Sequence, residues 1–183
     1  MHEYSDGEIV GCLRAIDEAP TAHAKGAALE QLSRYLFEGI PGVTFERRNI
    51  LDTPRAHELD VAFWNDLRQS ELHFLDAGII VECKATGSPV GSSALGWFIR
   101  KLQDRGSHNG ILVALNGITG TADQVSSAHS EILNGMMRDQ IRILVLTRRE
   151  IVPLSSPTEL VNLLRKKYMR LILDRSVYLG GDH

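Results

Sequence analysis

The first part of the chain alternates apolar and polar residues with the spacing of an α-helix. One helix is predicted to begin in the sequence Ser-Asp-Gly-Glu at residues 5–8, which has the form of a capping box, and to end before Pro20. A second is predicted from its N-cap, Thr21, to about Glu38, with Gly39 as its C′ residue. Their apolar faces contain Ile9, Leu13 and Ile16, and Ala28, Leu29, Leu32 and Leu36.

Five later segments have the pattern of β-strands, at residues 42–48, 57–64, 78–85, 110–115 and 141–147. The first two alternate apolar and polar side chains, as strands with one buried face do. The fourth is apolar on both faces, which is typical of a central strand that runs parallel to a neighbour. Because the linker at residues 65–77 is short, the second and third strands are expected to be antiparallel neighbours.

Three more helices alternate with these strands. One is predicted over about residues 94–105, capped by Ser92 or Ser93; its Trp97 is placed in the core in preference to a surface contact for a base. Another begins at Thr121, and the last begins at Ser156, which is followed by Pro at N1 and by Glu at N3. The order is helix, helix, three strands, helix, strand, helix, strand, helix, which predicts a single α/β domain over residues 1–183.

Charged residues stand where the third strand ends. Glu82 and Lys84 are two positions apart, so their side chains point to one face of the strand and Cys83 points to the other. The simplest interpretation is a solvated, inert ion pair. On the preceding strand, however, Asp60 or Glu58 would lie beside Glu82 if the two strands pair. Asp60, Glu82 and Lys84 are therefore expected to converge.

An Asp on one strand and Glu-x-Lys at the end of the next resembles the pattern of the PD-(D/E)XK nucleases, which have the restriction-endonuclease-like fold. Leu59 stands where the family name has Pro, a position that is loose in the family. The run at 80–84, the Gly/Ser-rich turn, the helix and the strand at 109–114 are similar to the Mrr-like type IV restriction branch. The resemblance covers residues 21–147. It implies an αβββαβ core with a mixed central sheet flanked by helices.

The same resemblance implies that residues 1–20 add an N-terminal helix and that a strand and a helix follow the core, with residues 148–183 as a helical extension. It also implies that Asp60, Glu82 and the backbone carbonyl of Cys83 hold Mg²⁺, for which Mn²⁺ would substitute. Lys84 would orient the attacking water or stabilise the transition state. Further polar site residues of this branch correspond to Glu30, for which an exposed helix acid is an equal alternative, and to Gln103.

Composition and charge change this picture little. The 183 residues are 43% hydrophobic and 23% charged, as in ordinary globular domains, and the net charge of −3 argues only weakly against a nucleic-acid binder. The basic residues that flank the expected site are either a solvated face or phosphate contacts: Arg47, Arg48, Arg55, Arg100 and Lys101. No apolar run has the length of a membrane span, and the start has no signal-peptide pattern, so we expect a cytoplasmic protein.

Three classes of function remain open at this stage. The resemblance implies a metal-dependent endonuclease that cuts DNA in defence against foreign DNA, as a homodimer or as the effector subunit of a larger complex. DNA repair or junction resolution would use the same chemistry. The second class is a non-catalytic nucleic-acid-binding module on the same fold, whose mark would be a broken triad. The third is a structural protein in which Asp60, Glu82 and Lys84 form a salt-bridge cluster.

Overall fold

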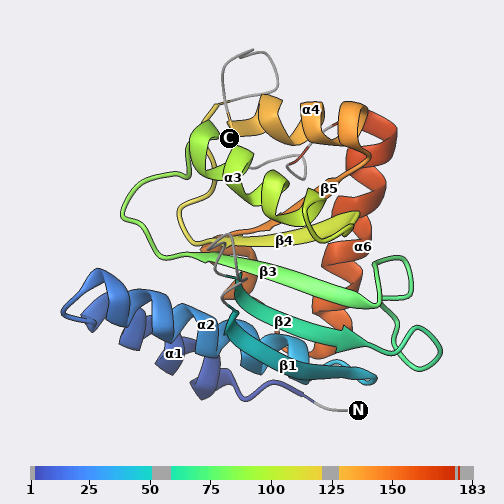
Figure 1. The fold of residues 1–183 in the computed structure, drawn as a ribbon. Helices are drawn as coiled ribbons and strands as arrows, with labels where there is room; N and C mark the ends of the chain where they lie inside the picture. The colour runs from blue at the N-terminus through green and yellow to red at the C-terminus, as the bar shows by residue number, and fades with distance from the viewer. Residues whose placement is uncertain (1–2, 51–58, 121–127, 176, 178–183) are drawn as a thin grey trace.

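The computed structural model describes residues 3–50, 59–120, 128–175 and 177. Its centre is a five-stranded sheet in the order β1-β2-β3-β4-β5 (Figure 1). The strands are β1 (Val43–Ile50), β2 (Leu59–Asn65), β3 (Gly78–Lys84), β4 (Asn109–Ala114) and β5 (Arg142–Leu146). The β1–β2 and β2–β3 pairs are antiparallel, whereas β3–β4 and β4–β5 are parallel. This mixed sheet confirms the predicted pairing of the second and third strands and the central place of the fourth.

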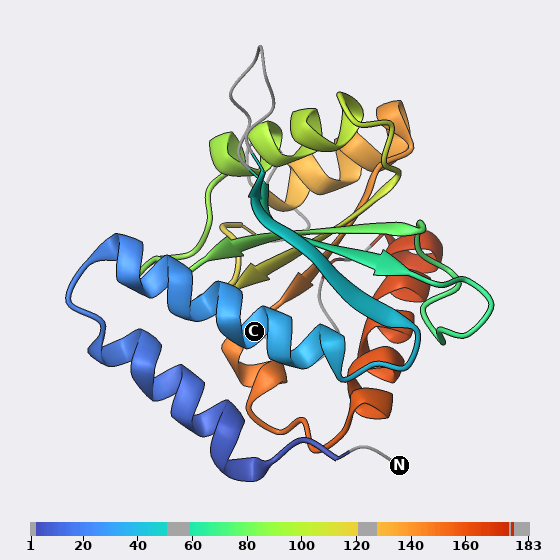
Figure 2. The ribbon, with the colours of Figure 1, turned by 60° about the horizontal axis from the view of Figure 1, so that its bottom comes forward.

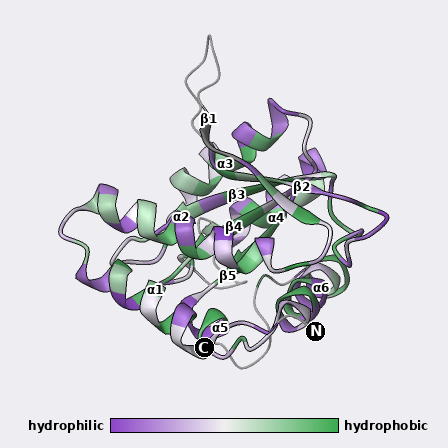
Figure 3. Cartoon of the chain, turned by 90° about the horizontal axis from the view of Figure 1, so that it is seen from below, coloured by the Kyte–Doolittle hydropathy of each residue, from purple (hydrophilic) through white to green (hydrophobic). Residues whose placement is uncertain are grey.

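The described helices cover both faces of the sheet. They are α1 (Asp6–Glu18), α2 (Ala22–Glu38), α3 (Ser92–Gln103), α4 (Ala128–Asp139), α5 (Arg148–Ile151) and α6 (Pro157–Asp174). Helices α3 and α4 lie on one face and α2 and α6 on the other, with α1 outside α2 (Figures 1 and 2). Hydrophilic and hydrophobic segments alternate along α1, α2 and α6, as in helices that bury one side (Figure 3). The α/β arrangement is the one predicted.

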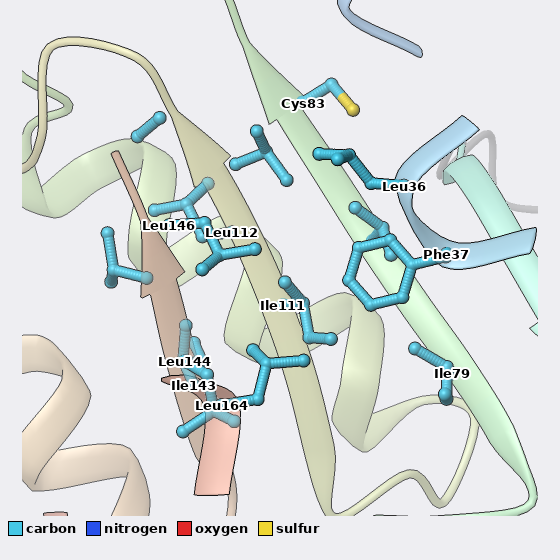
Figure 4. Close-up of a cluster of buried hydrophobic side chains, with 14 of the residues drawn as sticks. Leu36, Phe37, Ile79, Cys83, Ile111, Leu112, Ile143, Leu144, Leu146 and Leu164 are labelled. Carbon is cyan, nitrogen blue, oxygen red and sulfur yellow. The ribbon is translucent and has the colours of Figure 1, made fainter. Parts of the chain in front are cut away.

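Part of the core lies between the sheet and α2. Leu36 and Phe37 of α2 pack beside Ile79 and Cys83 of β3 (Figure 4). All six residues of β4 are buried because helices cover it on both faces. β4 is therefore fixed by packing along its whole length, and β3 is buried from Ile79 to Cys83.

On the opposite face, α3 lies unusually close to the sheet. Gly110 of β4 permits this approach, because a Cβ atom there would lie 2.6 Å from Leu102 Cδ1 and 2.8 Å from Phe98 Cζ. Both side chains are fully buried on the inner side of α3. The glycine thus sets how near α3 comes to the strand ends.

The helix ends agree only in part with the sequence. Thr21 caps α2 as predicted, and its Oγ1 accepts a hydrogen bond from Ala24 N at 3.1 Å. Ser5 is the N-cap of α1, but its side chain makes no capping hydrogen bond, so the expected capping box does not form. Gly39 has a right-handed helical backbone conformation (φ −65°), so it is not the left-handed C′ residue that was predicted. Its small size is still needed, because a Cβ atom would lie 2.9 Å from the Tyr4 ring.

Two further predictions in this region are wrong. Gly91 is the N-cap of α3, and Ser92 and Ser93 are its first helical residues. Trp97 is 54% exposed and does not belong to the core, because it lies off the buried stripe of the helix. The predicted helix start at Thr121 lies outside the described residues, and α4 is described from Ala128.

The C-terminal helix begins as the sequence predicts. Ser156 is its N-cap, its Oγ accepts from Glu159 N at 3.3 Å, and Pro157 is the first helical residue. The short helix α5 before it, capped by Thr147 and Glu150, was not predicted. Among the described helices, none combines the length and the apolar character needed to cross a membrane.

Candidate active site

The register of β2 and β3 places two carboxylates next to each other. Val61 pairs with Val81, so the next pair towards the strand end is Asp60 and Glu82, and paired residues point to the same face of a sheet. Asp60 Oδ2 accepts a hydrogen bond from the backbone N of Cys83 at 2.6 Å. The Asp60 carboxylate therefore binds a backbone N–H of β3 at the point where the hydrogen bonds between β2 and β3 end.

Both carboxylate oxygens of Glu82 contact ammonium groups. Lys84 Nζ lies 2.8 Å from Oε1, and Lys101 Nζ lies 2.8 Å from Oε2. The Glu82 side chain is only 4% exposed, whereas Lys101 is 13% and Lys84 31% exposed. Lys84 follows on the same face of β3, and Lys101 reaches the strand from α3. We call Asp60, Glu82, Lys84 and Lys101 the charged cluster; its formal charges sum to zero.

The charged cluster perturbs the ionisation of its members. Burial raises the pKa of the Asp60 carboxyl, and the charge of Glu82 raises it further. The Cys83 N–H and the two lysines act in the opposite direction without cancelling the rise. Burial alone would lower the pKa of Lys84, but the charge of Glu82 and its hydrogen bond outweigh burial, so this pKa is raised. Lys84 is therefore charged at neutral pH. Ionisation of Asp60 is less favourable than that of an Asp side chain in water.

Cys83 points to the other face of β3, as predicted. Its Sγ lies 3.3 Å from the hydroxyl of Ser33 on α2, and burial raises the pKa of the thiol, so the thiol stays protonated. Glu30, also on α2, is close enough for its charge to contribute to that rise. Glu30 is half-buried and approaches β3 from the Cys83 side. Glu30 is therefore not an exposed helix acid, and its role at the site stays a prediction.

The helix after β3 contributes Lys101 to the charged cluster, and not Gln103. Gln103 is exposed in the last turn of α3, and its side chain has no hydrogen bond to the cluster within the described part of the chain. Lys101 was predicted only as a nucleic-acid contact. Its place beside the buried stripe of Phe98 and Leu102 is the sequence signal that could have placed it towards the sheet.

The other basic residues are described only in part. Arg100 is exposed on α3, next to Lys101 in the sequence. Arg47 and Arg48 lie in β1, where only their backbone is described. Arg55 and the alternative acid Glu58 lie outside the described residues.

A pocket of 540 Å³ opens beside Lys84. Its walls are the link between α1 and α2, the first turns of α2 and the residues that follow β3. The lining residues are Ala19, Pro20, Thr21, Ala22, Lys25, Gly26, Cys83, Lys84, Ala85, Thr86 and Gly87. One end of the charged cluster is thus accessible to a ligand.

Two carboxylates are a sufficient protein contribution to a Mg²⁺ site, because Mg²⁺ keeps several waters and takes substrate phosphates as ligands. No group of three or more His, Cys, Asp or Glu side chains in the described segments is arranged to hold a metal ion. Asp60 and Glu82 are two such carboxylates. The charge of Glu82 opposes ionisation of Asp60, and a bound divalent cation would relieve this repulsion. The donor set therefore fits a hard cation that is shared with a phosphate.

Comparison with known proteins gives one family. The family model of the Mrr catalytic domain, described as a restriction endonuclease, matches residues 22–144. The comparisons with curated proteins and with solved structures give no significant match. The matched residues run from the first turn of α2 into β5 and include every member of the charged cluster. The chain therefore belongs to the Mrr family of PD-(D/E)XK nucleases, and its domain is a restriction-endonuclease-like nuclease.

Proposed function

We propose that the protein is a metal-dependent endonuclease that hydrolyses phosphodiester bonds of DNA with Asp60, Glu82 and Lys84. One observation carries this proposal: two neighbouring strands bring two carboxylates and a lysine together at a strand end that opens into a pocket. All three residues are intact, which argues against a non-catalytic binding module. A purely structural ion-pair cluster would not need Asp60 to bear a charge that burial disfavours.

Asp60 and Glu82 would hold Mg²⁺ or Mn²⁺. The carbonyl of Cys83 is a suitable third ligand, because the N–H and C=O of one residue in an extended strand face the same side, and its N–H already faces Asp60. When bound, the cation neutralises charge on the phosphoryl oxygens and activates water.

Lys84 supplies a fixed positive charge beside these carboxylates. Its ammonium is held by Glu82, its pKa is raised, and Lys84 is one of the residues that line the pocket. Such an ammonium stabilises the charge that develops on the phosphoryl oxygens and orients an attacking water. We further propose, on the family membership, that the reaction serves defence against foreign DNA.

Cleavage of supercoiled plasmid and of single-stranded DNA tests the proposal. Wild type, Lys84→Ala and the control Lys166→Ala, which removes an exposed lysine of α6, are compared with Mg²⁺, Mn²⁺ or EDTA. Wild type and Lys166→Ala should cut in either metal. Lys84→Ala should cut on the order of a hundredfold more slowly, and EDTA should abolish cleavage.

Cleavage that survives in purified Lys84→Ala and Asp60→Asn would show that the assignment of the site is wrong. Melting curves of the same samples with Mn²⁺ give a second readout. If wild type neither cuts DNA nor gains stability from Mn²⁺ in an Asp60-dependent way, the metal-dependent function is refuted.

A further inference from the structure

The ion pair between Lys101 and Glu82 has no role in the proposed reaction. The Lys101 ammonium lies 2.8 Å from Glu82 Oε2, on a residue whose second oxygen is already bound by Lys84. The Lys101 side chain is 13% exposed, so it is the less solvated of the two lysines. In this arrangement each oxygen of Glu82 already has an ammonium partner.

A divalent cation and Lys101 therefore compete for the same carboxylate. The charged cluster is neutral with both lysines in place, and a divalent ion would leave it with an excess of two positive charges. Like charges held a few ångströms apart in a partly buried place repel strongly. Lys84 is on the same strand as Glu82, two residues away, whereas Lys101 comes from the separate helix α3, so we take Lys101 as the partner that can leave.

The position of Lys101 on α3 indicates where it goes. Arg100 precedes it on the exposed side of the helix, and Arg105 NH1 donates to the Lys101 carbonyl at 3.1 Å, so this end of α3 is basic. A phosphate that enters beside the cluster brings negative charge to the same place and offers the ammonium a new partner.

We propose that Lys101 is a positioning residue that makes metal binding depend on the nucleic acid. In the free protein it neutralises Glu82 and keeps the metal affinity low. When a phosphate of the nucleic acid takes its ammonium, Glu82 is released to the metal. By linkage, the nucleic acid raises the metal affinity by the same factor by which the metal raises the nucleic-acid affinity. This inference rests on the proposed metal site of Asp60 and Glu82.

Calorimetric titration of the EDTA-stripped proteins with Mn²⁺ alone tests whether Lys101 lowers the metal affinity of the free protein. Lys101→Met keeps the length and apolar stem of the side chain and removes its charge, so it should bind Mn²⁺ roughly tenfold more tightly than wild type. Arg100→Met removes the same charge from the adjacent exposed position and should bind like wild type. Lys101→Arg keeps the charge and should also bind weakly. A gain of affinity is not expected from a variant that is merely damaged.

The same titration in the presence of a short DNA duplex tests whether the nucleic acid raises the metal affinity through Lys101. The integrity of the duplex is checked on a gel. The duplex should raise the Mn²⁺ affinity of wild type and leave that of Lys101→Met nearly unchanged.

The outcomes separate the two proposals. If Lys101→Met binds Mn²⁺ no more tightly than wild type while Asp60→Asn abolishes binding, the metal site stands and the role of Lys101 is wrong. If no variant binds Mn²⁺, with or without DNA, both are wrong. An equal gain in Arg100→Met would show a general charge effect and would also overturn the role of Lys101.

Discussion

At the scale of residues, the site is a balance of buried charges. Glu82 is almost completely buried, and an isolated carboxylate there would cost several kcal/mol. Two ammonium groups and the closeness of both contacts offset that cost. Asp60 is compensated less well, because its hydrogen-bond donor, the backbone N–H of Cys83, is neutral. The raised pKa of Asp60 is the result, and it makes Asp60 a strained member of the cluster.

This strain predicts that Asp60→Asn stabilises the metal-free protein at neutral pH by about 1 kcal/mol. The pKa of Asp60 is higher in the folded state than in the unfolded chain, so the folded protein binds the proton more tightly. Its contribution to the free energy of unfolding therefore falls as the pH rises from the unfolded pKa through the folded one. Above the folded pKa the full penalty is present, and the neutral amide, whose oxygen can still accept from Cys83, removes it. Urea unfolding in EDTA measures the effect.

The control for that experiment is Asp139→Asn, which changes an exposed carboxylate at the end of α4 and should leave the unfolding midpoint unchanged. At acidic pH, where Asp60 is protonated in wild type, the difference between wild type and Asp60→Asn should disappear. A lower midpoint for Asp60→Asn at neutral pH would show that the carboxylate is stabilised in the free protein, contrary to the strain argued here.

At the scale of elements, α3 decides whether Lys101 reaches Glu82, and Gly110 decides where α3 lies. Gly110→Ala should lower the free energy of unfolding by about 2 kcal/mol, because the new Cβ meets Leu102 and Phe98 at less than normal contact distance. Gly96→Ala on α3 is the matched control. A Cβ there meets nothing within 4 Å, so it should raise stability by up to about 1 kcal/mol. Equal effects of the two changes in urea unfolding would contradict this packing.

The same helix shows what the sequence could and could not predict. The strands were predictable because the first two alternate apolar and polar residues and the later ones are continuous apolar runs. The meeting of Asp60 with Glu82 followed from the short linker between the second and third strands. Lys101 was not predicted in the cluster: its place beside the buried stripe of α3 indicates the side of the sheet, but its contact with Glu82 depends on how closely α3 packs. Trp97 was misplaced because residue type was weighted above its position off the buried stripe. Gln103 is exposed in the last turn of this helix, and its role at the site stays a prediction.

At the scale of the whole molecule, the family match ends at residue 144, but the structure does not divide there. Helix α6 buries Leu160, Val161 and Leu164 in the same core as the strands. It also buries Lys167, whose side chain is 1% exposed and whose Nζ lies 2.5 Å from Glu150 Oε1. The other oxygen of Glu150 accepts from the backbone N and the hydroxyl of Thr147, directly after β5.

This chain of contacts predicts that α6 supports the edge of the sheet that carries the site, because β3, β4 and β5 are parallel and end at one edge. Lys167→Ala should lower the free energy of unfolding by about 3 kcal/mol, since it leaves Glu150 half-buried without its cation. Lys166→Ala, one residue earlier and exposed, should change it by less than about 0.5 kcal/mol. Urea unfolding of the two variants beside wild type gives the comparison. If both behave like wild type, the ion pair of Lys167 with Glu150 does not support this edge of the sheet, and α6 is held by its buried apolar residues alone.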